Sequence, residues 1–143
     1  MRQRLKSSRL TRRATVAALL GAGALVAMRP ASAQAPAVNS GDTATLDEAR
    51  RLHESGAAVL IDLREPDEHA TGVAAGARLL PLSQLGRRAG EIARDRPVLL
   101  ICNTQNRSRR AHQALKDAGW TNLRYVQGGM SEWARRGWPM VKP

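Results

Sequence analysis

Residues 98–108 of this chain, VLLICNTQNRS, decide its fold and point to its chemistry. The four consecutive apolar residues 98–101 are typical of a strand that is buried on both faces. Alanine and leucine recur at helical spacing after Ser108, and Gly119 stands where a helix C-cap is expected. The only cysteine, Cys102, therefore stands where a buried strand ends and a polar loop leads directly into a helix.

This position suits a nucleophilic cysteine. Backbone N–H groups in such a loop point inward and bind anions, and the helix dipole favours a thiolate over a thiol. Arg107 adds a positive charge nearby, so Cys102 is suited to attack on an anionic substrate. The alternative is that Cys102 is a small buried apolar side chain. The polar run after it argues against that alternative, because a buried strand usually leaves through a turn.

The rest of the chain alternates predicted strands and helices. Thr45, with Glu48 three residues later, fits a capping box that opens a helix, which Gly56 ends. Further strands are predicted over residues 57–63, 77–82 and 123–126, and further helices over residues 85–93 and 130–136. This alternation predicts an α/β domain with a central parallel sheet and helices on both faces.

Charged residues cluster after the strand predicted over residues 57–63. Open α/β sheets place their sites at the carboxyl ends of strands, so Asp62 and Arg64 are candidates to face a cleft. Asp67 and Glu68 are better explained by a short capped helix, because acidic side chains favour a helix's first turn.

Charge is concentrated at the N-terminus. The chain has 143 residues and a net charge of +11, and residues 1–33 hold seven of its 23 basic residues and none of its 12 acidic ones. The remainder therefore has 16 basic against 12 acidic residues, or +4. Because the aromatic residues are not interleaved with basic ones, we expect no nucleic-acid partner. The length allows one domain, and a lone cysteine predicts neither an internal disulfide nor a structural metal site.

The N-terminus has the three-part layout of a secretory signal peptide. Residues 1–13 are basic, residues 14–28 are uncharged and apolar, and Ala31-Ser32-Ala33 offers a cleavage site. A signal peptide is therefore predicted over residues 1–33, and the mature chain is expected near Gln34, in the periplasm or otherwise exported. An uncleaved membrane anchor is the alternative, but the apolar run is short for a span, so no stable membrane insertion is expected after cleavage.

The export route is less sharply defined. Arg12 and Arg13 resemble the twin-arginine signal, although Thr15 stands where that signal usually has a large apolar residue. The general secretory route is the alternative. Small and polar residues then predict a linker over residues 34–44, followed by a folded domain over residues 45–143.

The chain resembles the rhodanese family of sulfurtransferases from about Thr45 to Pro143. No single motif decides this, but four of them occur in the expected order. They are LIDLREPDE at 60–68, the Cys102–Arg107 loop, GWTNL at 119–123, and GGMSEW at 128–133 with GWP at 137–139.

The resemblance implies a small rhodanese-like domain in which Cys102 takes the outer sulfur of an anionic donor such as thiosulfate and holds it as a persulfide. Cyanide in an assay, or a small or protein thiol in the cell, would then accept the sulfur, and no metal or organic cofactor is needed. Arg107 would bind or screen the anion. The residues implied in substrate binding are Asn103, Thr104, Gln105, Asn106, Arg107 and Ser108.

Loop length separates the chemistries of this fold. Four residues separate Cys102 from Arg107, whereas phosphatase relatives have five and a wider cradle, so sulfur transfer is favoured over dephosphorylation. An alternative from another class is a non-catalytic exported sulfur carrier or rhodanese-like binding module. The loop lacks both the second cation of many thiosulfate users and the Gly-Ser-Gly run of mercaptopyruvate users, which leaves the donor open.

Overall fold

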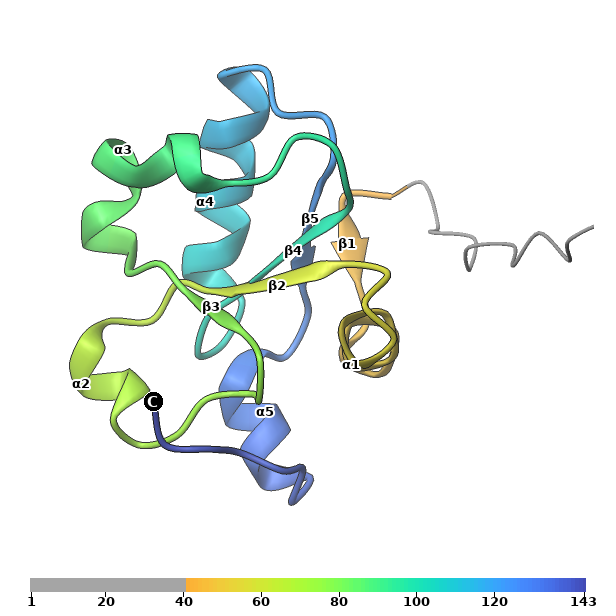
Figure 1. Ribbon diagram of the computed structural model, residues 1–143, viewed down its shortest axis with the longest axis vertical. Helices are drawn as coiled ribbons and strands as arrows, with labels where there is room; N and C mark the ends of the chain where they lie inside the picture. The colour runs from red at the N-terminus through yellow and green to blue at the C-terminus, as the bar shows by residue number, and fades with distance from the viewer. Residues whose placement is uncertain (1–40) are drawn as a thin grey trace, which may run out of the picture. The chain divides into compact units, whose positions relative to one another are not determined.

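A computed structural model describes residues 41–143, so the predicted signal peptide and most of the predicted linker lie outside the described residues. Its strands form one parallel sheet in the order β1-β5-β4-β2-β3 (Figure 1). They are β1 (Thr43–Ala44), β2 (Val59–Asp62), β3 (Arg78–Leu79), β4 (Val98–Ile101) and β5 (Leu123–Val126). The predicted parallel α/β fold is confirmed, and the strand before Cys102 is its central strand.

Helices cover both faces of the sheet. Helices α1 (Leu46–Glu54) and α5 (Gly129–Arg135) pack on one face, and α3 (Leu85–Arg88) and α4 (Asn106–Asp117) pack on the other. Successive strand side chains point to opposite faces. Accordingly, Leu99 and Ile101 join the core with α1 and α5, whereas Val98 and Leu100 join the core with α4. Cys102 continues this alternation and falls on the side of α4.

The domain begins earlier than the sequence indicates. Thr43 and Ala44, which the sequence places in the linker, form β1 and pair with Tyr125 and Val126 of β5. Only two residues pair, which is too few for a periodic signal. The Thr45 cap is present, since its Oγ1 accepts a hydrogen bond from the Glu48 amide at 3.2 Å.

The single helix predicted over residues 85–93 is instead the short helix α3 followed by the 3-10 turn η2 (Ala89–Glu91). Another 3-10 turn, η1 (Leu82–Gln84), precedes them. Gly86 lies within α3 and Gly90 within η2. Each glycine costs about 1 kcal/mol in a helix relative to alanine, which disfavours one continuous helix. The strand predicted over residues 77–82 is also shorter in the structure, where β3 ends before Pro81. Proline has no backbone N–H to donate to a neighbouring strand.

Asp62 and Arg64 do not face a cleft. Both are buried, and Nη2 of Arg64 lies 2.7 Å from Oδ2 of Asp62 and 2.7 Å from the carbonyl oxygen of Gly72. Arg64 also donates to the carbonyl oxygen of Glu68 at 3.2 Å. The pair therefore ties the end of β2 to helix α2 (Pro66–His69), which it positions beside the loop that follows β4.

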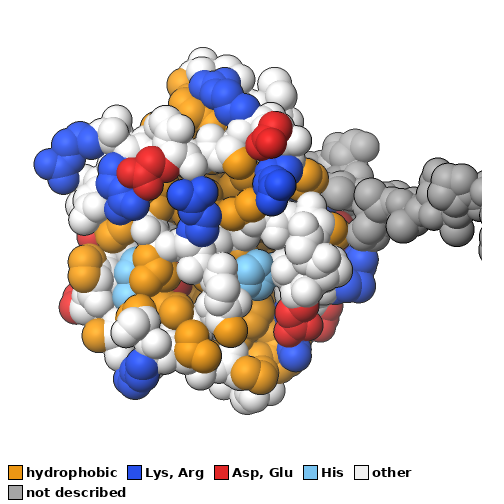
Figure 2. Space-filling view, viewed as in Figure 1, with side chains coloured by type: hydrophobic (Ala, Val, Ile, Leu, Met, Phe, Trp, Pro, Cys, Tyr) orange, Lys and Arg blue, Asp and Glu red, His pale blue; other side chains and the backbone are white. Residues whose placement is uncertain are grey.

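The described surface carries mixed charge. Figure 2 shows Lys and Arg side chains standing beside Asp and Glu on the viewed face, rather than a single basic stripe. Among residues 41–143, no helix is both long and apolar enough to cross a bilayer.

Candidate active site

The candidate site lies in the loop between β4 and α4, at the carboxyl end of the sheet. In Figure 1 this loop lies between α2 and α5. Contacts from both helices confirm the placement, since Glu68 of α2 binds Arg107, and Met130 and Ser131 of α5 bind the loop backbone. Cys102 stands first in the loop and is only 1% exposed.

Two polar groups of Ser108 contact the Cys102 sulfur. The Ser108 amide donates to Sγ at 3.3 Å, and the Ser108 hydroxyl oxygen lies 3.5 Å from Sγ. Burial raises the pKa of the Cys102 thiol, but hydrogen bonds from Ser108 and from the amides of Thr104 and Gln105 outweigh burial and leave that pKa below its ordinary value. The site therefore stabilises a thiolate.

Gln105 gives the loop its shape. Its φ of 90° makes it the one non-glycine residue with positive φ in the described part of the chain. Gln105 is left-handed and is followed by the right-handed residues of α4. A left-handed residue next to a right-handed one turns successive N–H groups toward one point, as in an anion-binding nest. This conformation costs about 1–2 kcal/mol. The Ser108 hydroxyl, 3.1 Å from the Gln105 carbonyl oxygen, and the Gly128 amide, 3.4 Å from Gln105 Oε1, help to hold it.

Helix α5 holds the loop carbonyls. The Met130 amide donates to the Cys102 carbonyl at 2.8 Å, and the Ser131 amide donates to the Asn103 carbonyl at 3.0 Å. The Ser131 hydroxyl adds a second bond to Asn103 at 2.8 Å. Gly129 lies so close that a Cβ atom there would come within 2.3 Å of the Asn103 oxygen. Sequence reasoning missed this support. The signal that could have found it is the Gly128-Gly129 pair, since a glycine lets two backbone segments approach closely.

In the structure, Arg107 forms an ion pair with Glu68 of α2. The sequence predicts that it binds or screens the anion, but its Nη1 and Nη2 lie 2.6 Å and 2.5 Å from the two carboxylate oxygens of Glu68. Arg107 holds the pKa of Glu68 down to about 2, so both groups are charged near neutral pH. The sequence assigns Glu68 to helix capping, and the structure shows that it also forms this pair.

The remaining loop residues expected to bind substrate differ in exposure. The side chains of Thr104 and Asn106 are exposed, Asn103 is half-buried with its carbonyl turned to α5, and Ser108 is buried against the sulfur. The structure thus places the amide and the hydroxyl of Ser108 at the sulfur. The amides of Thr104 and Gln105, rather than their side chains, also lower the pKa of the thiol.

Replacing Ser108 tests what lowers the pKa of the Cys102 thiol. Ser108→Ala deletes the hydroxyl but keeps the amide, so we expect the thiol to ionise at higher pH than in the wild type. Thiolate absorbance near 240 nm, titrated with pH, measures this directly because Cys102 is the only cysteine. Ser131→Ala is the control, since its hydroxyl contacts the Asn103 carbonyl and not the sulfur. Identical titrations for the wild type and Ser108→Ala would contradict the assignment.

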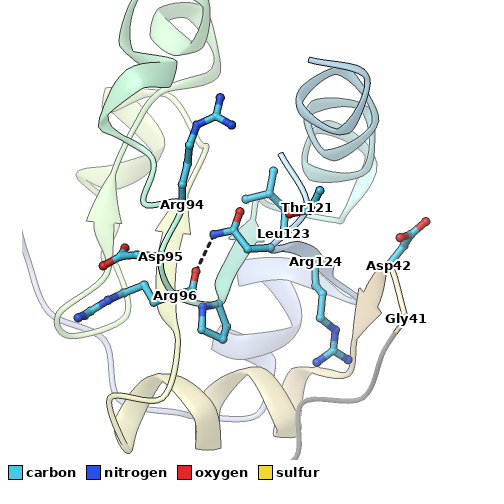
Figure 3. A pocket seen from close by; sticks show the side chains of 10 residues that line it. Gly41, Asp42, Arg94, Asp95, Arg96, Thr121, Leu123 and Arg124 are labelled. Carbon is cyan, nitrogen blue, oxygen red and sulfur yellow. Dashed lines mark hydrogen bonds between the residues drawn. The ribbon is translucent and has the colours of Figure 1, made fainter. Parts of the chain in front are cut away.

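A hollow of about 520 Å³ lies at the other end of the sheet, beside the first residues of β4 and β5 (Figure 3). Its polar groups serve the fold, since the Asn122 amide donates to the Arg96 carbonyl and Arg124 binds Glu48. The Arg94 and Arg96 side chains point away from each other in Figure 3 and do not converge on one ligand position. Cys102, past the far end of β4, does not line this hollow.

Comparison with known proteins agrees with this geometry. A family model, the Rhodanese-like domain, matches residues 45–136. The chain belongs to this rhodanese family. A protein named Sulfurtransferase from Allochromatium vinosum is 35% identical to it over 106 residues, which cover 74% of this chain and 97% of that protein.

Two further relatives extend the comparison. Uncharacterized protein YqhL of Bacillus subtilis is 47% identical over 76 residues, which cover 53% of this rhodanese-like chain. The match covers 60% of that relative, so the chain spans less than two thirds of its length. The crystal structure of a rhodanese-related protein from Thermoplasma volcanium superimposes with a TM-score of 0.65 at 28% identity, over 72% of this chain and all of that one.

Proposed function

We propose that the protein is a sulfurtransferase that uses Cys102 as its nucleophile. The Cys102 thiolate attacks the outer sulfur of an anionic donor, a new S–S bond forms, and the bond between the two donor atoms breaks. With thiosulfate, the thiolate becomes a persulfide anion and sulfite leaves with the bonding electron pair. An acceptor such as cyanide or a thiolate then takes the outer sulfur and restores the Cys102 thiolate.

The observation that supports this proposal is a buried sulfur that accepts a hydrogen bond from the Ser108 amide at the start of α4. The Ser108 amide is 3.3 Å from Sγ, and the Thr104 and Gln105 amides also stabilise the anion. The same amides can stabilise a persulfide, which is an anion one sulfur longer. Such fixed donors need no reorganisation during reaction, which is the main source of electrostatic catalysis.

Loop size supports sulfur transfer over phosphoryl chemistry. Only four residues lie between Cys102 and Arg107, and Arg107 is bound to Glu68 in the structure. A phosphate ester would need donors for three oxygens around the phosphorus atom. A single sulfur atom needs only the small set of amides that the loop presents.

Steady-state kinetics test the proposal. We expect thiocyanate to form from thiosulfate and cyanide with parallel lines in double-reciprocal plots, because the first product leaves before the acceptor binds. A persulfide that forms but does not turn over with cyanide or thiols would favour the sulfur-carrier alternative. Intersecting lines would contradict a Cys102 persulfide intermediate.

A further inference from the structure

The Glu68–Arg107 pair is part of the framework of the site. The two terminal nitrogens of the guanidinium each donate to one oxygen of the carboxylate, and this bidentate geometry is strong for such a pair. Glu68 is itself held, because its Oε2 accepts a hydrogen bond from the Glu65 amide at 3.0 Å. Glu65 in turn binds the amide and hydroxyl of Ser83. Arg107 is therefore held against α2 by the Glu68 carboxylate, which a second hydrogen bond, from the Glu65 amide, keeps in place.

This pairing changes the charge that a donor meets. Arg107, in the first turn of α4, is the only cation within residues 102–108, and Glu68 cancels its charge. Arg64, which also lies beside Glu68, is paired with Asp62. The next cations along the chain, Arg109 and Arg110, are exposed and line a separate hollow with Tyr125 on another side of α4. An approaching donor thus meets neutral amides and an anionic sulfur, with no uncancelled positive charge in the loop.

Resting on the proposed sulfur transfer, we propose that Glu68 sets the donor preference of the site by cancelling the charge of Arg107. Donors with one negative charge, such as organic thiosulfonates, are then used better than the thiosulfate dianion. The chemistry balances for both. The Cys102 thiolate takes the outer sulfur to form a persulfide anion, and the organic sulfinate or sulfite leaves with the electron pair.

The charge of the pair is constant under working conditions. The pKa of Glu68 is about 2, so the carboxylate stays ionised across the pH range of an assay. Changing the pH therefore does not uncover Arg107, and the preference has to be tested by substitution. Glutamine suits this purpose, because its side-chain oxygen can still accept the hydrogen bond from the Glu65 amide.

The test compares thiosulfate with the methanethiosulfonate anion, which carries the same transferable sulfur and one charge less. In Glu68→Gln we expect the ratio of kcat/KM for thiosulfate to that for methanethiosulfonate to rise about fivefold or more, mainly through KM. The kcat/KM for thiosulfate should also fall more steeply with added salt than in the wild type, since screening acts on the uncovered charge. A purely structural role for Glu68 would not change the salt dependence.

Companion variants separate charge from folding. Arg107→Gln leaves the negative charge of Glu68 without a partner. The ratio of kcat/KM for thiosulfate to that for methanethiosulfonate should then fall below the wild-type value. The double variant Glu68→Gln/Arg107→Gln is neutral like the native pair, so its ratio should return toward the wild type. Glu48→Gln is the matched control, because Glu48 binds Arg124 through two similar contacts of 2.8 Å and 2.9 Å at the other end of the sheet. That control should leave the ratio unchanged.

The outcomes distinguish the two proposals. If the wild type forms a Cys102 persulfide, but Glu68→Gln and Arg107→Gln both keep the wild-type ratio, the role of Glu68 is wrong and sulfur transfer stands. If Glu68→Gln does not fold, Arg107→Gln and the double variant decide the question through the opposite shift and its reversal. If neither donor yields a persulfide in the wild type, both proposals are overturned.

Discussion

Cys102→Ser is expected to abolish sulfur transfer. Thiocyanate formation from any sulfane-sulfur donor should fall at least about 1,000-fold, to the rate of the uncatalysed reaction. The reason is that a serine hydroxyl remains protonated at neutral pH and cannot hold the transferred sulfur as a persulfide. No other thiol can replace it, because the chain has a single cysteine.

The measurement is thiocyanate production under saturating donor and cyanide, with the unfolding transition of the variant checked alongside. Serine is nearly the same size as cysteine, and the Ser108 amide remains to bind its oxygen, so the fold should persist. Activity within tenfold of the wild type in a folded Cys102→Ser variant would mean that another group carries the reaction.

Gly129→Ala is expected to produce the largest loss of stability in the site. A Cβ atom at this position would lie 2.3 Å from the Asn103 carbonyl oxygen and 2.5 Å from the Cys102 carbonyl oxygen. These atoms are backbone, so the loop or α5 has to move. Together with the positive φ of 60°, this should cost about 3 kcal/mol or more in the free energy of unfolding. The rate of sulfur transfer should fall as well, because the displaced carbonyls belong to Cys102 and Asn103, and their movement shifts the loop that holds the sulfur.

Gly137→Ala is a closely matched control. Gly137 has a φ of 65°, but nothing lies within 4 Å of the position of its Cβ. Its replacement therefore carries only the conformational cost of about 1 kcal/mol and should leave activity unchanged. Urea unfolding of both variants measures the difference. Equal losses would show that the close approach of Gly129 to the loop does not matter.

The sequence predicted the parts of the site that are local. The apolar run before Cys102, the polar loop and the helix after it are contiguous, so periodicity alone placed them correctly. The parallel sheet followed from the alternation of strands and helices. Strand β1 was missed and the strand predicted over residues 77–82 was too long, because β1 and β3 have two residues each and are defined by their partners rather than by a pattern.

The parts that were missed are contacts between distant segments. The position of Glu68 in the first turn of a helix already explained why the residue is acidic. Nothing further in the sequence indicated its ion pair with Arg107, 39 positions away. Asp62 and Arg64 were placed correctly at a strand end, but the sequence did not show that they bind each other and are buried. The export signal lies outside the described residues and stays a prediction.

The persulfide itself provides the most direct test. Intact-mass analysis of the purified protein, before and after incubation with thiosulfate or methanethiosulfonate, should show a gain of one sulfur atom. Cyanide should remove this atom, and Cys102→Ser should never gain it. An unchanged mass with both donors, or a gain that persists in Cys102→Ser, would contradict the central claim that a thiolate held by loop amides accepts and passes on the sulfur.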